Sequence, residues 1–234
     1  MLIRKELRSM KVLTLDVGNT SIDACLFDGK DITFLGKFSH WQVEDLKNSY
    51  DEIYIASVKP SMNRFLMETF KNACFILNEH IPLKATFDTK NVGIDRLLNL
   101  YGALNFYSED ALVVSCGTAL VLDVLVRGAF EGGFITLGLL GKLKCLSEKA
   151  ELIPSLDLKK VDVFVGRDTQ SAILGGILRE AKSFIVVLLD ELKKTYFREF
   201  SLIITGGDGW LLRDMGVYDP LLIHKAILRI RKFL

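Results

Sequence analysis

The sequence has few cysteines and histidines, and this scarcity excludes two kinds of site. Its four cysteines, Cys25, Cys74, Cys116 and Cys145, are scattered and form no CxxC pair. A disulfide framework or a structural zinc site would need closer or repeated spacing. We therefore expect buried free thiols. The three histidines are equally isolated, so no metal cluster or histidine-based triad can be drawn from them.

An excess of charge of one sign is also lacking. Lysine and arginine together number 30, and aspartate and glutamate number 29. This balance implies no broad basic surface, so nucleic acid is not an expected partner. Two short basic clusters, at residues 4–8 and 229–232, are interpreted as solvated helix faces or chain ends.

Long hydrophobic runs are missing as well. The longest apolar stretches, such as residues 184–189, are much shorter than the roughly 20 residues that cross a bilayer. Basic residues near the start of the chain are followed by no apolar signal core, and residues 1–9 are interpreted as an extension without a role in the fold. We expect no membrane partner and a cytoplasmic location.

The chain does contain a strand pattern that occurs twice. Each occurrence is an antiparallel meander whose first turn holds a glycine. The strands predicted for the first meander are 11–16, 21–27 and 32–38, and those for the second are 111–115, 120–126 and 129–136. Helices and strands alternate after each meander, which favours mixed sheets flanked by helices, an α/β fold. The repeat of this organisation suggests two domains, 10–107 and 108–234.

Helices are predicted at residues 42–48 and 61–72, and a long one at 169–194. Further strands are predicted at 53–56, 73–77 and 202–205, the last leading into another helix through Gly206 and Gly207.

The first glycine turn (residues 16–21, Asp-Val-Gly-Asn-Thr-Ser) suits a phosphate group. A glycine lets an anion approach the backbone N–H groups closely, and the Asn, Thr and Ser side chains add donors. Asp16 at the strand end can hold Mg²⁺ directly or through water, because Mg²⁺ prefers carboxylate and phosphate oxygens. The alternative from this motif alone is an ordinary hairpin with a polar turn.

Two later turns strengthen the phosphate interpretation. The second glycine turn (residues 115–119, Ser-Cys-Gly-Thr-Ala) again places a glycine and a hydroxyl between antiparallel strands. Two such turns across a cleft would hold the phosphates of a nucleotide. The third glycine turn (residues 205–208, Thr-Gly-Gly-Asp) follows an apolar strand and would pass closely against adenine or ribose. By itself, a Gly-Gly pair is more often a plain strand-to-helix turn.

The order of these motifs, DVGNTSI, SCGTA and ITGGD, resembles the phosphate-one, phosphate-two and adenosine motifs of the acetate kinase, sugar kinase, heat-shock 70 and actin superfamily. The segment 91–99, with its GxDRxxN pattern, and the segments 131–135 (EGGFI) and 165–169 (VGRDT) are similar to those of type III pantothenate kinases. The resemblance implies duplicated ribonuclease H-like, actin-like ATPase domains. The ATP- and phosphate-binding residues would be Asp16, Val17, Gly18, Asn19, Thr20, Ser21, Gly117, Thr118, Gly206 and Gly207.

This resemblance implies a transferase that uses ATP and Mg²⁺ to phosphorylate pantothenate, the first step of coenzyme A biosynthesis, as a homodimer formed through the second domain. Asp95 would be the general base and Arg96 would bind the pantothenate carboxylate in a bidentate manner. Gly93, Ile94 and Thr169 would complete the substrate contacts. The alternative for Asp95 and Arg96 is a surface pair at the start of a helix.

At the expected site, two positions depart from the family pattern. Ser115 stands where the family usually has an aspartate that helps to bind a monovalent cation, so dependence on K⁺ or NH₄⁺ is in doubt. Phe87 stands near the position of a tyrosine that lines the substrate pocket. A non-catalytic nucleotide- or pantothenate-binding regulator is therefore an alternative function. A filament-forming ATPase is disfavoured because the chain has no inserted assembly subdomain.

Overall fold

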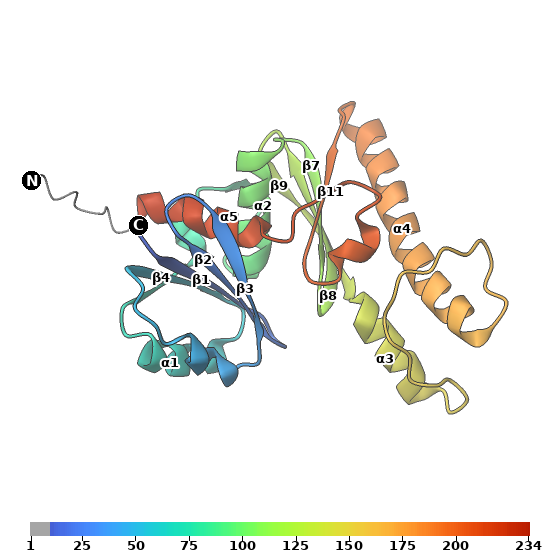
Figure 1. Ribbon diagram of the computed structural model, residues 1–234. Helices are drawn as coiled ribbons and strands as arrows, with labels where there is room; N and C mark the ends of the chain where they lie inside the picture. Colours follow the sequence, from blue (N-terminus) through green and yellow to red (C-terminus); the bar gives the residue numbers. More distant parts are fainter. Residues whose placement is uncertain (1–9) are drawn as a thin grey trace, which may run out of the picture. The chain divides into compact units, whose positions relative to one another are not determined.

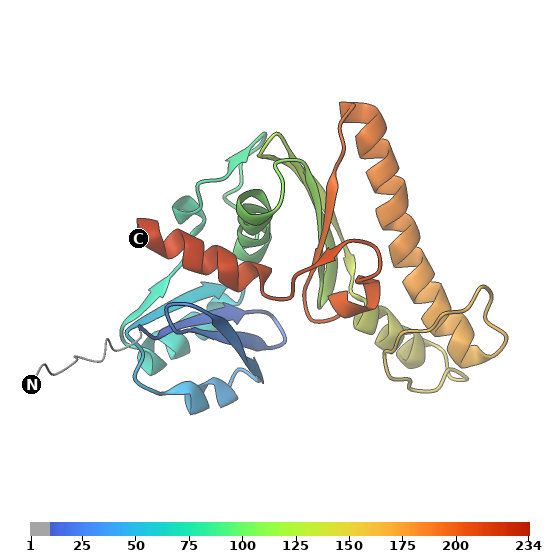
Figure 2. The same cartoon turned by 45° about the horizontal axis from the view of Figure 1, so that its top comes forward.

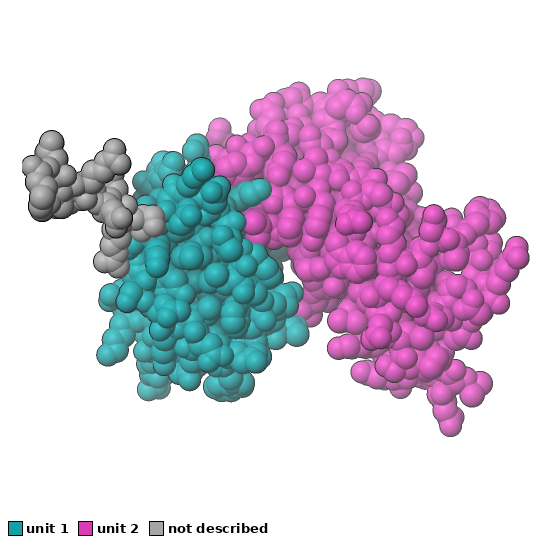
Figure 3. All heavy atoms as spheres, viewed as in Figure 1, with its two compact units in different colours: residues 1–81, 92–98, 223–234 teal, residues 82–91, 99–222 magenta. Residues whose placement is uncertain are grey.

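A computed structural model of the chain describes residues 10–234. The predicted extension 1–9 and the basic cluster 4–8 therefore lie outside the described residues. The chain divides into two compact units: unit 1 holds the residues up to 81 with 92–98 and 223–234, and unit 2 holds 82–91 and 99–222 (Figure 3). The domain boundary expected between residues 107 and 108 stays a prediction.

Unit 1 is built on a five-stranded sheet formed by the N-terminal strands of the chain (Figure 1). Its strands are β1 (Val12–Val17), β2 (Ile22–Phe27), β3 (Ile32–Phe38), β4 (Glu52–Ser57) and β5 (Ala73–Phe75). Their order in the sheet is β3-β2-β1-β4-β5. β1 is antiparallel to β2 and parallel to β4. The predicted meander is thus confirmed, and β1 lies at the centre of the sheet.

One face of this sheet holds an apolar core. Alternate residues of β1, Leu13 and Leu15, pack with Met62 and Leu66 of α1 (Pro60–Thr69). The helix predicted at 42–48 is instead a short 3₁₀ helix, η1 (Gln42–Leu46), whose end is closed by an i to i+3 bond from the Lys47 N–H to the Glu44 carbonyl. A further 3₁₀ turn, η2, spans Asn78–His80.

The opposite face of β1 carries a buried polar pair. α5 (Leu222–Ile230) places His224 against this face, with its Nδ1 atom 2.8 Å from the Thr14 hydroxyl. His224 is 1% exposed. Burial lowers the pKa of His224 to about 4, because the charged imidazolium loses its hydration.

This pair makes stability depend on pH. The unfolded chain takes up a proton on His224 near pH 6.5 and the folded protein only near pH 4. The stabilising effect of a neutral His224 is therefore complete above pH 6.5 and is lost as the pH falls toward 4. We expect the free energy of unfolding to drop by about 2 kcal/mol more in the wild type than in His224→Gln between pH 7 and pH 5.

Urea unfolding of both proteins at the two pH values measures this difference, and the contributions of all other titrating groups cancel between them. If the free energies of unfolding of the wild type and of His224→Gln fell by the same amount between the two pH values, His224 would not titrate as its buried position requires.

Unit 2 repeats the topology of unit 1. Its strands are β6 (Lys84–Ala85), β7 (Ala111–Cys116), β8 (Ala119–Val126), β9 (Ala129–Leu137), β10 (Ser201–Thr205) and β11 (Val217–Tyr218). The order β9-β8-β7-β10-β11 matches β3-β2-β1-β4-β5 strand for strand, and β6 is added beyond β9. In both sheets the register shifts once between the second and third strands. The predicted duplication is confirmed.

Helices cover both faces of the second sheet. α3 (Leu139–Lys149) and α4 (Thr169–Tyr196) share a core with Leu112 and Val114 of β7, and Figure 2 shows residues 99–106 of α2 (Ile94–Phe106) on the side opposite α4. The helix predicted after Gly207 is only a 3₁₀ turn, η3 (Gly209–Leu212). It is too short to act as an anion site at a helix N-terminus. The last element is another 3₁₀ turn, η4 (Arg231–Phe233).

The cysteine prediction is confirmed in one respect and wrong in another. All four thiols are free, but Cys145 is exposed and Cys74 only partly buried. Cys145 is exposed because α3 buries only Leu139 and Leu143, and residue 145 points to another side of the helix. Within residues 10–234, no helix combines the length and apolar character that a membrane crossing requires.

Candidate functional site

The first glycine turn joins β1 to β2 at the end of the central strand of unit 1. The Gly18 N–H donates to the Ser21 carbonyl at 3.0 Å, which closes the hairpin. Asp16 lies directly opposite Asp23 in the antiparallel register, so both carboxylates extend from the same face of the sheet.

Asp16 is electrostatically unusual. Burial, followed by the nearby negative charges of Asp95 and Asp23, raises its pKa to about 8, and Lys37 opposes the change. Lys37 also lies 3.6 Å from the Asp23 carboxylate. Within unit 1, one acidic side chain from β2 and one from the helix that follows residue 93 thus act on Asp16.

Asp95 occupies the first turn of α2. Its Oδ1 atom accepts the Arg96 N–H at 2.9 Å. A β-carbon on Gly93 would come within 2.5 Å of this oxygen, so glycine at 93 leaves the space that the carboxylate occupies. Burial raises the pKa of Asp95, while the N–H and the charge of Arg96 act in the opposite direction. A carboxylate with a raised pKa is a stronger base, which suits proton abstraction.

The chemistry of this acidic group fits a hard cation. A cation beside Asp16 would favour its ionised form and offset the repulsion from Asp95. Among the described residues, no cluster of three or more acidic, histidine or cysteine side chains is arranged to hold a metal by itself. Mg²⁺ commonly binds in this manner, through one or two carboxylates with water and substrate phosphates completing its shell.

In unit 2, the second and third glycine turns lie against each other. β10 runs parallel to β7 with Thr205 beside Ser115, and the Asp208 N–H donates to the Cys116 carbonyl at 3.0 Å. Gly206 has a φ of +86°, and a β-carbon there would lie 2.3 Å from the Cys116 carbonyl oxygen. Both the positive φ and this close approach require glycine. The structure therefore joins two motifs that are about ninety residues apart.

The outer side of the second turn is open. Its hairpin is closed by the Gly117 N–H, which donates to the Ala119 carbonyl at 2.9 Å. A β-carbon on Gly117 would meet no atom within 4 Å, and Thr118 is exposed. This open backbone is what a phosphate contact needs. That the first and second turns bind the same nucleotide remains a prediction.

The remaining predicted residues occupy less enclosed positions. Thr169 is exposed as the first residue of α4, where the side chain of Asp168 caps the helix by accepting the Ser171 N–H. Phe87 packs on Phe130, with ring centroids 5.0 Å apart, and is 43% exposed. Ser115 is partly buried.

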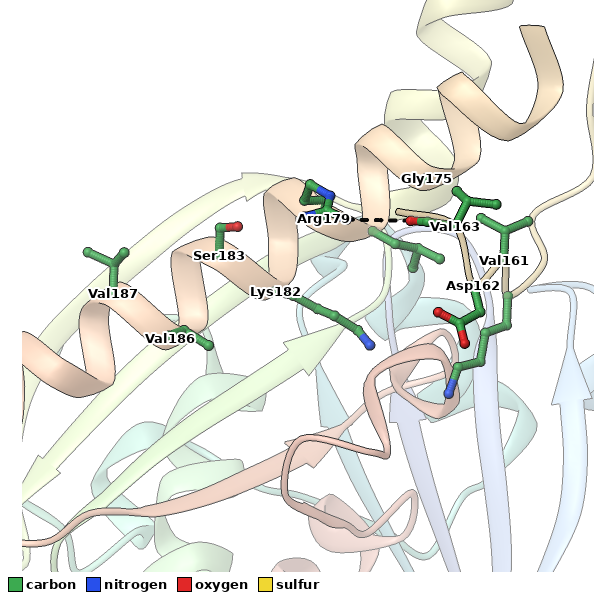
Figure 4. A pocket seen from close by; sticks show the side chains of 11 residues that line it. Val161, Asp162, Val163, Gly175, Arg179, Lys182, Ser183, Val186 and Val187 are labelled. Atoms are coloured by element: carbon green, nitrogen blue, oxygen red, sulfur yellow. Dashed lines mark hydrogen bonds between the residues drawn. The ribbon is translucent and has the colours of Figure 1, made fainter. Parts of the chain in front are cut away.

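A groove of about 380 Å³ lies elsewhere on unit 2, between residues 160–163 and α4 (Figure 4). Valine and leucine side chains line it together with Lys160, Arg179 and Lys182. Both lysines already pair with Asp214, and Arg179 donates to the Phe164 carbonyl. None of the predicted site residues lines this groove, so it takes no part in the site.

Sequence reasoning missed three residues near the first glycine turn. The sequence does contain a signal for Asp23. It is as far from the middle of the predicted hairpin as Asp16 is, so the two residues are expected to pair across the strands. His40 and Lys59 had none. They contact the carbonyls of Gly18 and Asn19 from 22 and 40 residues away, and only the folding of the loops brings them there.

Comparison with known proteins identifies the family. The sequence profile of type III pantothenate kinases matches residues 12–191. The chain belongs to the type III pantothenate kinase family. The type III pantothenate kinase of Aquifex aeolicus is 40% identical over 221 residues, covering 93% of this chain and 96% of the relative. That of Thermosipho melanesiensis is 32% identical, with coverage of 88% and 90%.

Solved structures support the fold of this type III pantothenate kinase family member. A Baf family protein from Campylobacter jejuni, described as a transcriptional activator, has a TM-score of 0.69 and 24% identity, covering 94% of this chain and 98% of its own. Ta0583, an archaeal actin homologue solved with ADP, has a TM-score of 0.53 and 13% identity, with coverage of 96% and 100%. The predicted actin-like ATPase fold is thereby confirmed.

Proposed function

We propose that this protein transfers the γ-phosphoryl group of ATP to the primary hydroxyl of pantothenate, which yields 4′-phosphopantothenate and ADP and begins coenzyme A biosynthesis. One observation carries the proposal. The chain belongs to this kinase family, and its Asp95, a partly buried carboxylate with a raised pKa, lies close enough to Asp16 to raise the pKa of that residue. Phosphoryl transfer requires positioning and charge neutralisation, together with a base for the acceptor.

Each proposed site residue has a role that follows from its chemistry. Asp95 accepts the hydroxyl proton as the new O–P bond forms and the bond from the γ-phosphorus to the β,γ-bridging oxygen breaks. Asp16 would hold Mg²⁺, directly or through water, and the chemistry supplied there would be neutralisation of charge on the phosphates. The backbone of the first and second glycine turns binds the phosphate chain, while the third glycine turn borders the nucleoside.

Most of the proposed acceptor contacts lie within a few residues of Asp95 in the sequence, and Thr169 comes from the start of α4. Gly93 and the buried Ile94 contribute backbone groups, and the Thr169 hydroxyl and the Phe87 ring complete the pantothenate contacts. Arg96 binds the pantothenate carboxylate with two parallel N–H···O bonds, a geometry that the single ammonium of lysine does not provide.

The Arg96 contact gives a direct prediction. Arg96→Lys should raise the KM for pantothenate by about tenfold or more, the cost of a lost charge-assisted hydrogen bond, and leave the KM for ATP within about twofold. Steady-state kinetics with each substrate varied in turn measures both values. An unchanged KM for pantothenate would place the carboxylate contact elsewhere.

Formation of phosphopantothenate is the test of the whole proposal. Purified protein is incubated with ATP, Mg²⁺ and pantothenate in Na⁺, K⁺ or NH₄⁺ buffers, and phosphopantothenate and ADP are quantified by mass spectrometry. Product in equal amount with ADP supports the kinase, and equal rates in all three buffers would show that Ser115 has removed dependence on a monovalent cation. No product in any buffer, with nucleotide binding retained, would contradict the kinase and favour the regulator.

We also propose that two copies associate through unit 2. Apolar side chains stay exposed along β9 and the neighbouring part of α4, including Phe134 and Val187. The two elements are tied by Phe134 and Phe184, whose ring centroids lie 5.5 Å apart. An exposed apolar surface of this kind is typical of an interface, and homodimers formed through the second domain are expected from the family resemblance. The cytoplasmic location remains a prediction.

Charge placed on this surface should separate the copies. Phe134→Asp is expected to shift the protein from dimer to monomer in size-exclusion chromatography with light scattering, because a buried unpaired carboxylate opposes association. Met67→Asp, which replaces an equally exposed apolar side chain on α1 of unit 1, is the matched control and should remain dimeric. A dimeric Phe134→Asp protein would place the interface elsewhere.

A further inference from the structure

Two side chains from outside the β1–β2 hairpin contact the carbonyl oxygens of the first glycine turn. His40 Nε2 lies 3.0 Å from the Gly18 carbonyl, and Lys59 Nζ donates to the Asn19 carbonyl at 3.0 Å. Lys59 Nζ also lies 3.5 Å from His40 Nδ1. Both side chains are partly buried. They form one connected group, which we call the His40–Lys59 clamp.

Only one arrangement of hydrogens satisfies all three contacts. A carbonyl oxygen can only accept, so Nε2 of His40 must carry the hydrogen that it donates to Gly18. The lone pair of Nδ1 then faces Lys59, whose ammonium group has hydrogens for both His40 and the Asn19 carbonyl. The bonds form a chain from Lys59 through His40 to Gly18, and each strengthens the next.

The backbone of Lys59 is itself fixed, so its side chain reaches the turn from a rigid base. The Val58 N–H donates to the Val17 carbonyl at 3.0 Å, at the end of β1. The Lys59 N–H donates to the Ser57 hydroxyl at 3.2 Å, and this hydroxyl donates to the Asn63 side chain at 2.7 Å. β4 therefore delivers Lys59 to the first glycine turn in a defined position.

Holding the carbonyls also sets the direction of the N–H groups. In a planar trans peptide, the C=O of one residue and the N–H of the next point to opposite sides. With the Gly18 and Asn19 carbonyls held by the clamp, the N–H groups of Asn19 and Thr20 are directed away from it. A turn whose N–H groups are already oriented toward the phosphate binds more tightly, because binding then requires little loss of conformational entropy.

We infer that His40 and Lys59 are positioning residues that hold the first glycine turn in the orientation in which its N–H groups bind the phosphates of ATP. The inference rests on the proposed use of ATP, and it concerns nucleotide affinity rather than the transfer step. Neither residue touches the reacting atoms in this role.

Binding of ATP, measured by calorimetry without pantothenate, tests the clamp separately from turnover. His40→Phe and Lys59→Met should each weaken ATP binding by about tenfold, as expected for loss of a hydrogen bond from a charged or polarised donor. The double variant should be little weaker than either single one, because the bonds form one chain. His40→Gln should restore much of the affinity, since its side-chain amide can donate to the Gly18 carbonyl.

Lys71→Met is the matched control. Lys71 is exposed in the loop after α1, and its replacement removes the same charge as Lys59→Met. The ATP affinity of this variant should match that of the wild type. The KM for pantothenate should stay unchanged in the clamp variants, and their thermal midpoints should fall by no more than a few degrees. Wild-type affinity in His40→Phe would overturn the inference, and if Lys59→Met alone were weakened, Lys59 would act as an isolated charge. Failure of wild-type turnover, with clamp-dependent ATP binding intact, would contradict the kinase but not the clamp.

Discussion

Replacement of Asp95 by asparagine is expected to lower turnover by about a hundred- to ten-thousand-fold, the range found for loss of a general base. Asparagine keeps the size of the side chain, and its carbonyl oxygen can still accept the Arg96 N–H that Asp95 accepts at 2.9 Å. It has no basic oxygen to take the proton of the acceptor hydroxyl. The local fold should survive while the proton transfer fails.

Single-turnover kinetics with ATP binding measured in parallel separates these effects. The affinity for ATP should change by less than about threefold, because Asp95 acts on the acceptor hydroxyl. The loss of its negative charge is the one change that the ATP phosphates experience. Asp88→Asn, which changes an exposed aspartate of unit 2, is a control for general loss of charge. Turnover within a few-fold of wild type would show that Asp95 is not the base.

Replacement of Asp16 by asparagine is expected to abolish Mg²⁺-dependent turnover and yet to stabilise the nucleotide-free protein. The folded pKa of Asp16 is about 8, against 3.8 for an unperturbed aspartate. A carboxyl group with a raised folded pKa stabilises the fold least when it is ionised, so stability falls as the pH rises from about 4 to about 8. The slope approaches about 1.4 kcal/mol per pH unit in the limit.

The neutral amide of the Asp16→Asn variant lacks this slope. Thermal unfolding without ligands should therefore give similar midpoints for the two proteins near pH 4 and a higher midpoint for Asp16→Asn at pH 8. Adding Mg²⁺ and ATP should stabilise the wild type more than the variant, because the ion favours the ionised carboxylate. A variant less stable than the wild type at pH 8 would contradict the burial and repulsion assigned to Asp16.

The Asp95→Asn and Asp16→Asn variants both test a conflict between stability and ligand binding in unit 1. Asp23 and Asp95 add to the effect of burial and raise the cost of ionising Asp16, which weakens the fold near neutral pH. The same arrangement suits a site that receives a cation together with phosphate groups. Residues that bind ligands are commonly retained at such a cost in stability.

Much of the strand pattern could be predicted from local signals. The alternating apolar residues of β1 and β2 and the glycine turns between strands depend on neighbours only a few residues apart, so the sequence predicted both meanders. Helix lengths were less accessible. η1 and η3 proved to be short 3₁₀ turns, and α3 was not predicted, because the packing of Leu139 and Leu143 against the second sheet decides that helix.

By itself, the sequence determined the chemical groups of the site: Asp16, Asp95 and three glycine turns in a family-specific order. The tertiary structure decided which of these groups interact within each unit. It placed Asp95 where it raises the pKa of Asp16, set Gly206 against the Cys116 carbonyl and brought Lys59 to the first glycine turn. The reason is physical: a local pattern fixes the conformation of a few neighbouring residues, whereas contacts between distant residues depend on how strands pair and how helices pack on them.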